Sequence, residues 1–218
     1  MSTDDFIVIT SVSCKKEGDK VILDPFADSG DTAVFLQNPE KRDDGTYLAT
    51  EVDYEEAARI IGNKTSNTSR TPLFCVHGYW NEPSDIIDVI SKRRTKFKNS
   101  KYFPIFVIWP CSGWFNLQKG SFSGYNKDAD EHSQDSGKAF FDFVKKIPDH
   151  TFPRKSLLMH SMGNHVVFDG ACKDGAPEVQ FDNIFMVAAV RYTTNFEVSV
   201  LALFTSFILR LSVFCMHE

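Results

Sequence analysis

Short, continuously apolar segments alternate with helix-like segments through much of the chain, and this alternation constrains the fold more than any other feature. Four of the apolar segments are predicted to be buried strands: residues 72–76, 104–109, 156–159 and 183–190. Strands that are apolar throughout are typical of a parallel sheet covered on both faces by helices. The predicted fold class is therefore α/β, with a mostly parallel sheet and helices on both faces.

The predicted helices have apolar residues at helical spacing. They cover residues 54–61, 85–97, part of 127–147, and 163–172. Asp53 precedes the first of them and is expected to cap it. Residues 62–71 are polar and are expected to form a loop.

The N-terminal part of the chain has a different pattern. Residues 6–12, 21–23 and 33–36 are short strand-like segments, and turns rich in Asp, Gly and Pro separate them. A chain of 218 residues is expected to form one domain, which we place over residues 1–197.

Charge and cysteine content restrict the partners and the compartment. A net charge of −5 argues against a nucleic-acid partner. The basic run at residues 92–98 is interpreted as a solvated helix end, with a patch for nucleic acid or lipid headgroups as the alternative. The five cysteines have no paired spacing and residues 1–5 do not resemble a signal peptide. Both features favour a reducing, cytoplasmic environment.

The tail, residues 198–218, differs from the rest in composition. Residues 198–216 are mostly apolar and nearly long enough to span a bilayer. Arg210 lies within them and would cost about 2.5–3.5 kcal/mol at the bilayer centre. Three alternatives remain open: a packed core element, a membrane anchor, which is not favoured, and a segment foreign to the fold.

Ser161 stands between a predicted strand and a predicted helix. The mostly apolar segment 156–159 leads into it, small and polar residues surround it, and a helical pattern follows from Gly163. This pattern is typical of a nucleophile elbow, in which the serine hydroxyl is exposed at a sharp turn. The alternative is a serine that caps an ordinary helix.

A serine nucleophile needs a base for its proton and donors for the oxyanion that forms during acyl transfer. The backbone N–H of Met162 is one candidate donor, and that of Tyr79 or Trp80 is the second. Gly78 would allow the second donor's backbone to approach a substrate closely. His77 is expected to brace this loop.

Three motifs occur in order along the chain: Phe-Cys-Val-His-Gly-Tyr at residues 74–79, Trp-Pro-Cys-Ser-Gly at 109–113 and His-Ser-Met-Gly-Asn at 160–164. Together they resemble the α/β-hydrolase superfamily, and most closely an uncharacterised esterase/lipase-like family with H-G-Y, W-P-S-x-G and H-S-M-G-N motifs. The resemblance covers roughly residues 70–190. Met159 replaces the first glycine of the superfamily's G-x-S-x-G pattern.

The resemblance implies a serine hydrolase that acts on a small-molecule carboxylic ester or related acyl compound without a cofactor. Ser161 would be the nucleophile, and His160 and Gly163 would support it. The N-terminal strands fit the antiparallel strands that open such sheets.

The rest of a catalytic triad is hard to find. In this superfamily the acid and then the histidine follow the serine along the chain. After the predicted strand that ends at residue 190, the carboxylates are Glu197 and Glu218, and the histidine is His217. His217 is therefore a candidate base, with a frayed terminal residue as the alternative. The C-terminal end of the fold is expected to be incomplete, leaving an apolar sheet edge that the tail could cover.

The other histidines are weaker candidates. His160 and His165 flank the nucleophile, on the strand and on the helix, and His132 and His150 are expected at the surface. No pair has metal-ligand spacing, so no metal is expected. Three functions stay open: a serine hydrolase of esterase or lipase type, a catalytically incomplete hydrolase-fold protein, and a tail-anchored protein.

Overall fold

The structure is a computed structural model of the 218-residue chain. It describes residues 7–12, 14–23, 29–44, 46–66, 69–78, 87, 97, 100–111, 132–147, 154–173, 179–187 and 211–214.

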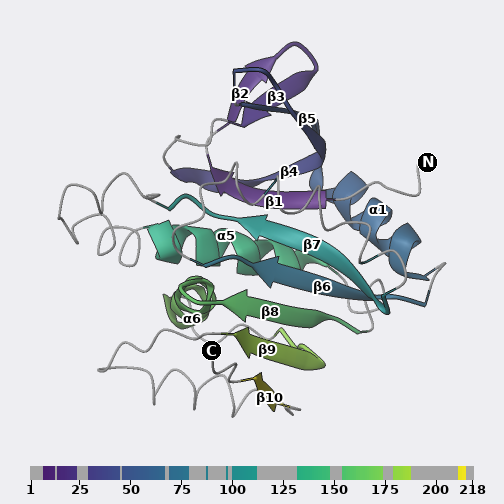
Figure 1. Ribbon diagram of the computed structural model, residues 1–218, viewed down its shortest axis with the longest axis vertical. Helices are drawn as coiled ribbons and strands as arrows, with labels where there is room; N and C mark the ends of the chain where they lie inside the picture. Colours follow the sequence, from purple (N-terminus) through teal and green to yellow (C-terminus); the bar gives the residue numbers. More distant parts are fainter. Residues whose placement is uncertain are drawn as a thin grey trace.

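Ten strands of the described residues form one mixed sheet, in the order β10-β9-β8-β6-β7-β1-β4-β5-β3-β2 (Figure 1). The strands are β1 (Ile7–Val12), β2 (Cys14–Glu17), β3 (Lys20–Leu23), β4 (Ser29–Lys41), β5 (Tyr47–Val52), β6 (Thr71–Val76), β7 (Tyr102–Ile108), β8 (Ser156–His160), β9 (Asn183–Val187) and β10 (Leu211–Phe214).

The sheet has a parallel part and an antiparallel part that meet at β1. β1 pairs with β7 in parallel and with β4 in antiparallel orientation. The strands from β7 to β10 continue in parallel, whereas β4, β5, β3 and β2 pair in antiparallel order. This arrangement confirms the predicted α/β class, with a mostly parallel central sheet and antiparallel N-terminal strands.

Helices α1 (Tyr54–Ser66), α5 (Ser133–Lys146) and α6 (Gly163–Lys173) pack into one core with the sheet. Alternate residues of β1 face opposite sides: Ile7 and Ile9 belong to this core, and Val8 belongs to a second one. Ile87, which is helical, lies in the second core. Both faces of the sheet therefore bury apolar side chains.

Helices α5 and α6 are in backbone contact. A β-carbon built on Gly137 would lie 2.1 Å from the carbonyl oxygen of Val166, and one built on Gly170 would lie 2.4 Å from the carbonyl carbon of Gly137. Only glycine allows this approach, so the two glycines determine how closely α6 lies to α5.

Helix α1 is longer than predicted. Asp53 caps it as expected, since its Oδ1 accepts a hydrogen bond from the Glu56 N–H at 2.8 Å. The helix then continues to Ser66, and β6 begins at Thr71. The prediction of a loop over residues 62–71 is therefore wrong for residues 62–66, which are helical, and for residue 71, which belongs to a strand. Thr65 explains the extension, because it is buried and its hydroxyl donates to the Ile61 carbonyl.

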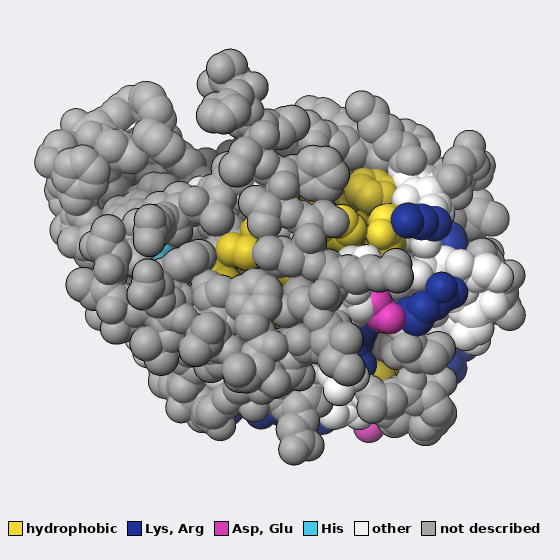
Figure 2. Space-filling model, turned by 90° about the horizontal axis from the view of Figure 1, so that it is seen from below, with side chains coloured by type: hydrophobic (Ala, Val, Ile, Leu, Met, Phe, Trp, Pro, Cys, Tyr) yellow, Lys and Arg dark blue, Asp and Glu magenta, His cyan; other side chains and the backbone are white. Residues whose placement is uncertain are grey.

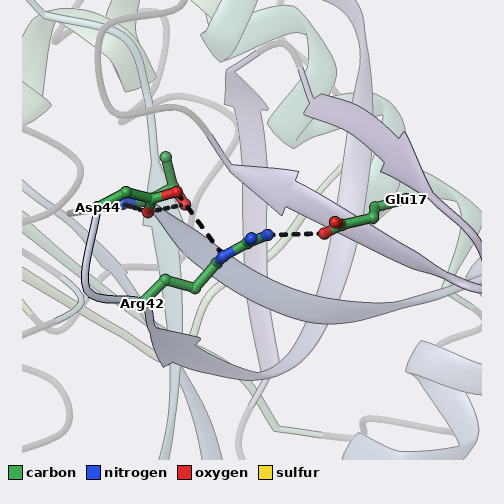
Figure 3. A network of polar contacts seen from close by, with 4 residues as sticks. Glu17, Arg42 and Asp44 are labelled. Atoms are coloured by element: carbon green, nitrogen blue, oxygen red, sulfur yellow. Dashed lines mark hydrogen bonds and ion pairs between the residues drawn. The ribbon is translucent and has the colours of Figure 1, made fainter.

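Strands β2 and β5 were not expected from the sequence. β2 lies at the sheet edge, and its three residues after Cys14 are exposed. Arg42 joins this end of the sheet by contacts to Glu17 at 2.6 Å and to Asp44 at 3.8 Å (Figure 3). Such exposed pairs contribute at most about 1 kcal/mol, so backbone pairing rather than burial makes β2 a strand.

Most of the tail lies outside the described residues. Residues 211–214 form β10, which pairs in parallel with β9 and brings Phe214 opposite Val187. Residues 211–214 therefore lie along the β9 edge of the sheet. Figure 2 views the molecule from that edge, where apolar side chains of described residues are visible with lysine and arginine side chains to one side. No helix among the described residues has the length and apolar character needed to cross a membrane.

Candidate functional site

The described residues of the three sequence motifs lie at the carboxyl edge of the parallel strands, where β6, β7 and β8 end (Figure 1). β6 ends at Val76, β7 at Ile108 and β8 at His160, and the residues that follow each strand come from one motif. Sites in open α/β sheets form at this edge.

Ser161 follows β8 directly and has a φ of 49°, in the left-handed region. Its N–H donates to the carbonyl of Val187, the last residue of β9, at 2.9 Å. Its carbonyl accepts two bonds from Asn164, one from the backbone N–H at 3.1 Å and one from the side-chain Nδ2 at 2.7 Å. Helix α6 begins two residues later. The serine therefore occupies a sharp strand-to-helix turn with both of its backbone polar groups bonded.

Two glycines allow the β6 and β8 ends to touch. A β-carbon on Gly163 would come within 2.6 Å of the carbonyl oxygens of Val76 and His77. One on Gly78 would come within 2.7 Å of both the Ser161 β-carbon and the His160 Nδ1. Larger residues at either position would push the loop after β6 away from the serine turn.

His77 joins the loop after β6 to the end of β7. Its Nδ1 donates to the Gly78 carbonyl at 2.8 Å, and its Nε2 accepts from the Trp109 N–H at 3.2 Å. The Trp109 indole N–H donates to the His77 carbonyl at 2.9 Å, and the two rings stack with centroids 5.4 Å apart. These contacts require a neutral ring with its proton on Nδ1. Burial lowers the pKa of His77 to about 4, which keeps the ring neutral at physiological pH.

The proposed oxyanion donors are placed only in part. Met162 lies at the turn between Ser161 and α6 and is buried. No acceptor engages its N–H in the part of the chain that the structure describes. This amide is at the positive end of α6, which suits a developing negative charge. Tyr79 and Trp80 lie outside the described residues.

The candidate base and acid also lie outside the described residues: His217, Glu197 and Glu218 are among the residues for which no structure is given. Among the described side chains, none hydrogen-bonds the Ser161 hydroxyl. His160 is exposed at the end of β8, and His165 lies on α6.

The prediction that His132 lies at the surface is wrong. It is buried, and its Nδ1 donates to the Pro110 carbonyl at 3.3 Å. Its place at the start of α5 brings it against the end of β7, and the sequence shows no such contact. His150 lies outside the described residues.

Two further expectations concern metal and thiol chemistry. The described residues contain no cluster of His, Cys, Asp and Glu that could hold a metal ion. The described cysteines Cys14, Cys75 and Cys111 form no disulfide. Burial raises the pKa of the Cys75 thiol to about 12, so this thiol is not a reactive nucleophile.

Met159 takes the position of the missing first glycine. It lies on β8, opposite Val76 and Met186 on the neighbouring strands. Its side chain is buried in the core that α5 and α6 cover. The methionine therefore fills apolar space beneath the turn.

The contacts of Trp109, Asn164 and the Val187 carbonyl were not predicted from the sequence. Trp109 and Asn164 belong to the quoted motifs, so their positions beside strand ends were a usable signal. The Val187 carbonyl had no sequence signal, because any residue at the end of β9 has the same backbone carbonyl.

The fold and the arrangement of these strand ends define the class of α/β-hydrolase-fold proteins. Residues 53–188 match the family described as "Alpha/beta hydrolase of unknown function (DUF900)", and the chain belongs to this family. No curated protein and no solved structure matches the chain.

Proposed function

We propose that the protein is a serine hydrolase of esterase or lipase type, acting on a carboxylic ester or a related small acyl compound. The observation that carries the proposal is the left-handed turn at Ser161, between β8 and α6 and in contact with Gly78. A left-handed serine at this edge is typical of a nucleophile elbow, whereas a serine that only caps a helix has extended backbone geometry.

In the proposed reaction, the Ser161 Oγ attacks the acyl carbon while a base takes the hydroxyl proton. The Met162 N–H, with that of Tyr79 or Trp80, binds the oxyanion of the tetrahedral intermediate. The intermediate collapses and expels the alcohol, which regains a proton from the base. Water then attacks the acyl-serine by the same route and releases the acid. His217 is the candidate base, with Glu197 or Glu218 to orient it.

A second candidate is a catalytically incomplete protein on the same scaffold, with a binding role. Among the described side chains none bonds the Ser161 hydroxyl, so the described residues leave this alternative open. Such a protein would retain the turn and the oxyanion donors but lack a group to remove the proton.

A fluorophosphonate probe separates the two candidates. Folded wild-type protein should be labelled at Ser161, and the Ser161→Ala variant should not. The rate of ester turnover should be higher in wild type than in Ser161→Ala. Both rates must be measured, because an oxyanion hole and substrate binding alone can leave about 10³–10⁴-fold acceleration over water. Absence of both labelling and excess turnover in folded protein would reject the hydrolase and favour the incomplete protein.

A further inference from the structure

Asn164 makes two contacts to one atom of the serine turn. Its Nδ2 lies 2.7 Å and its backbone N lies 3.1 Å from the carbonyl oxygen of Ser161. The Asn164 side chain is 1% exposed, so water does not compete freely for these bonds. Since a carbonyl oxygen only accepts, the side-chain atom facing it must be the NH₂ group.

The carbonyl that Asn164 holds belongs to the peptide group whose other end is the Met162 N–H. A trans peptide is planar, so its C=O and N–H point in opposite directions. Holding the Ser161 carbonyl therefore fixes the direction of the Met162 N–H. Hydrogen bonds to the carbonyl also polarise the peptide and make its N–H a stronger donor.

The turn needs such restraint because Ser161 has a positive φ, which costs free energy for a residue with a side chain. On one side, the Ser161 N–H is held by Val187. On the other side, the two bonds from Asn164 hold the carbonyl. Without them, the peptide between Ser161 and Met162 would be free to rotate toward ordinary helical geometry.

The Oδ1 atom of Asn164 indicates that the residue does not serve stability alone. Its Oδ1 is buried, and no group of the described residues forms a hydrogen bond with it. A buried unpaired acceptor destabilises a fold and offsets much of what the donor half contributes. A variant with an apolar side chain of similar size would be about as stable, but that side chain could not donate to the Ser161 carbonyl.

We propose that Asn164 is a positioning residue that aims and polarises the Met162 N–H as an oxyanion donor. The proposal rests on the function proposed above. It concerns the donor alone and requires no particular base or substrate.

Two substitutions of similar size test it. Asn164→Leu removes the Nδ2 donor and the unpaired acceptor together and leaves the backbone N–H bond, so we expect fluorophosphonate labelling of Ser161 to slow about 10–100-fold. The thermal midpoint should stay within a few degrees of wild type, since the two losses offset. If Asn164 were merely structural, labelling and midpoint would fall together.

Asn164→Asp supplies a pH signature. A carboxylate would face the Ser161 carbonyl with acceptors only, whereas the protonated acid has an O–H to donate. Labelling should be slow at about pH 8, and its ratio to wild type should rise toward about pH 5, where a buried carboxyl is protonated. Asn183→Asp is the matched control, because the Asn183 amide bonds Ser156 at the opposite end of β8. That variant should label like wild type.

Hydrogen exchange of the Ser161 N–H is a readout that needs no activity. We expect at least about tenfold faster exchange in Asn164→Asp than in wild type at neutral pH. If wild-type protein is not labelled, the proposed hydrolase fails, and exchange still decides whether Asn164 holds the turn. Unchanged exchange in Asn164→Asp would overturn the positioning role, as would wild-type labelling rates in both Asn164 variants.

Discussion

Gly78 lies so close to Ser161 that a β-carbon built on it would come within 2.7 Å of the Ser161 β-carbon. The loop after β6 and the turn after β8 are therefore in contact at the candidate nucleophile. If the donor expected at Tyr79 or Trp80 is correct, this contact would let it act on the same oxyanion as the Met162 N–H.

Substitution of Gly78 by alanine should separate the two loops. We expect Gly78→Ala to lower fluorophosphonate labelling of Ser161 by about 100-fold, because a displacement of about 1 Å has an effect of that size in catalysis. Gly18→Asn is a suitable control, since Gly18 also has a positive φ, which asparagine tolerates, and nothing lies within 4 Å of its β-carbon position. Equal labelling of wild type and Gly78→Ala would refute the role of the contact.

The neutral ring of His77 should make stability depend on pH. Burial lowers its pKa from 6.5 to about 4, and the nearby His160 adds to this effect, although the bond to the Gly78 carbonyl opposes it. Below pH 6.5 the histidine binds a proton in the unfolded chain but not in the folded protein. The free energy of unfolding therefore falls as the pH drops toward 4, and below pH 4 it falls no further from this cause. This loss is about 3 kcal/mol for a shift of this size.

Urea unfolding of wild type and His77→Asn between pH 4 and pH 7 measures this contribution. The wild-type protein should lose more stability than the variant across that window, because asparagine does not titrate. Parallel curves for the two proteins would show that His77 titrates normally and is not held neutral.

The backbone contact between α5 and α6 should tolerate no side chain. We expect Gly170→Ala to destabilise the protein by about 1–3 kcal/mol or more, since its β-carbon would meet the Gly137 backbone at 2.4 Å. This exceeds the gain of about 1 kcal/mol that alanine normally brings to a helix. Lys145→Ala, at an exposed position of α5, should change stability by less than about 0.5 kcal/mol in the same denaturation assay.

The cap of α1 should make a smaller contribution. Asp53→Ala removes the acceptor of the Glu56 N–H and should lower the free energy of unfolding by about 1 kcal/mol. Asp53→Asn should retain most of the stability, because asparagine is an equally good cap. Chemical denaturation of the three proteins decides this, and an equal loss in both variants would mean that charge, not the hydrogen bond, is responsible.

Local patterns were sufficient for the elements that contain a continuous apolar run. β6, β7, β8 and β9 each have such a run, so each was predictable within a few residues. β2 was not, because a strand with one half-buried and three exposed residues exists only through its pairing with β3. The end of α1 was missed for a related reason: the burial of Thr65 depends on contacts outside its own segment.

The candidate site divides in the same way. The position of Ser161 between strand and helix followed from residue order alone, and so did the small residues at 78 and 163. The bonds from Asn164 and Val187 to the serine backbone could not be predicted from residue order. The hydrogen bonds and ring stacking between His77 and Trp109 could not be predicted either.

By itself, the order of apolar runs, glycines and motif residues determined the class of fold, the parallel strands and the place of the serine turn. Only the tertiary structure decided what restrains that turn. The physical reason is that strand periodicity and steric need for glycine are properties of short segments. Hydrogen bonds between β6, β7, β8 and β9 ends exist only after the sheet has brought residues more than 20 positions apart into contact.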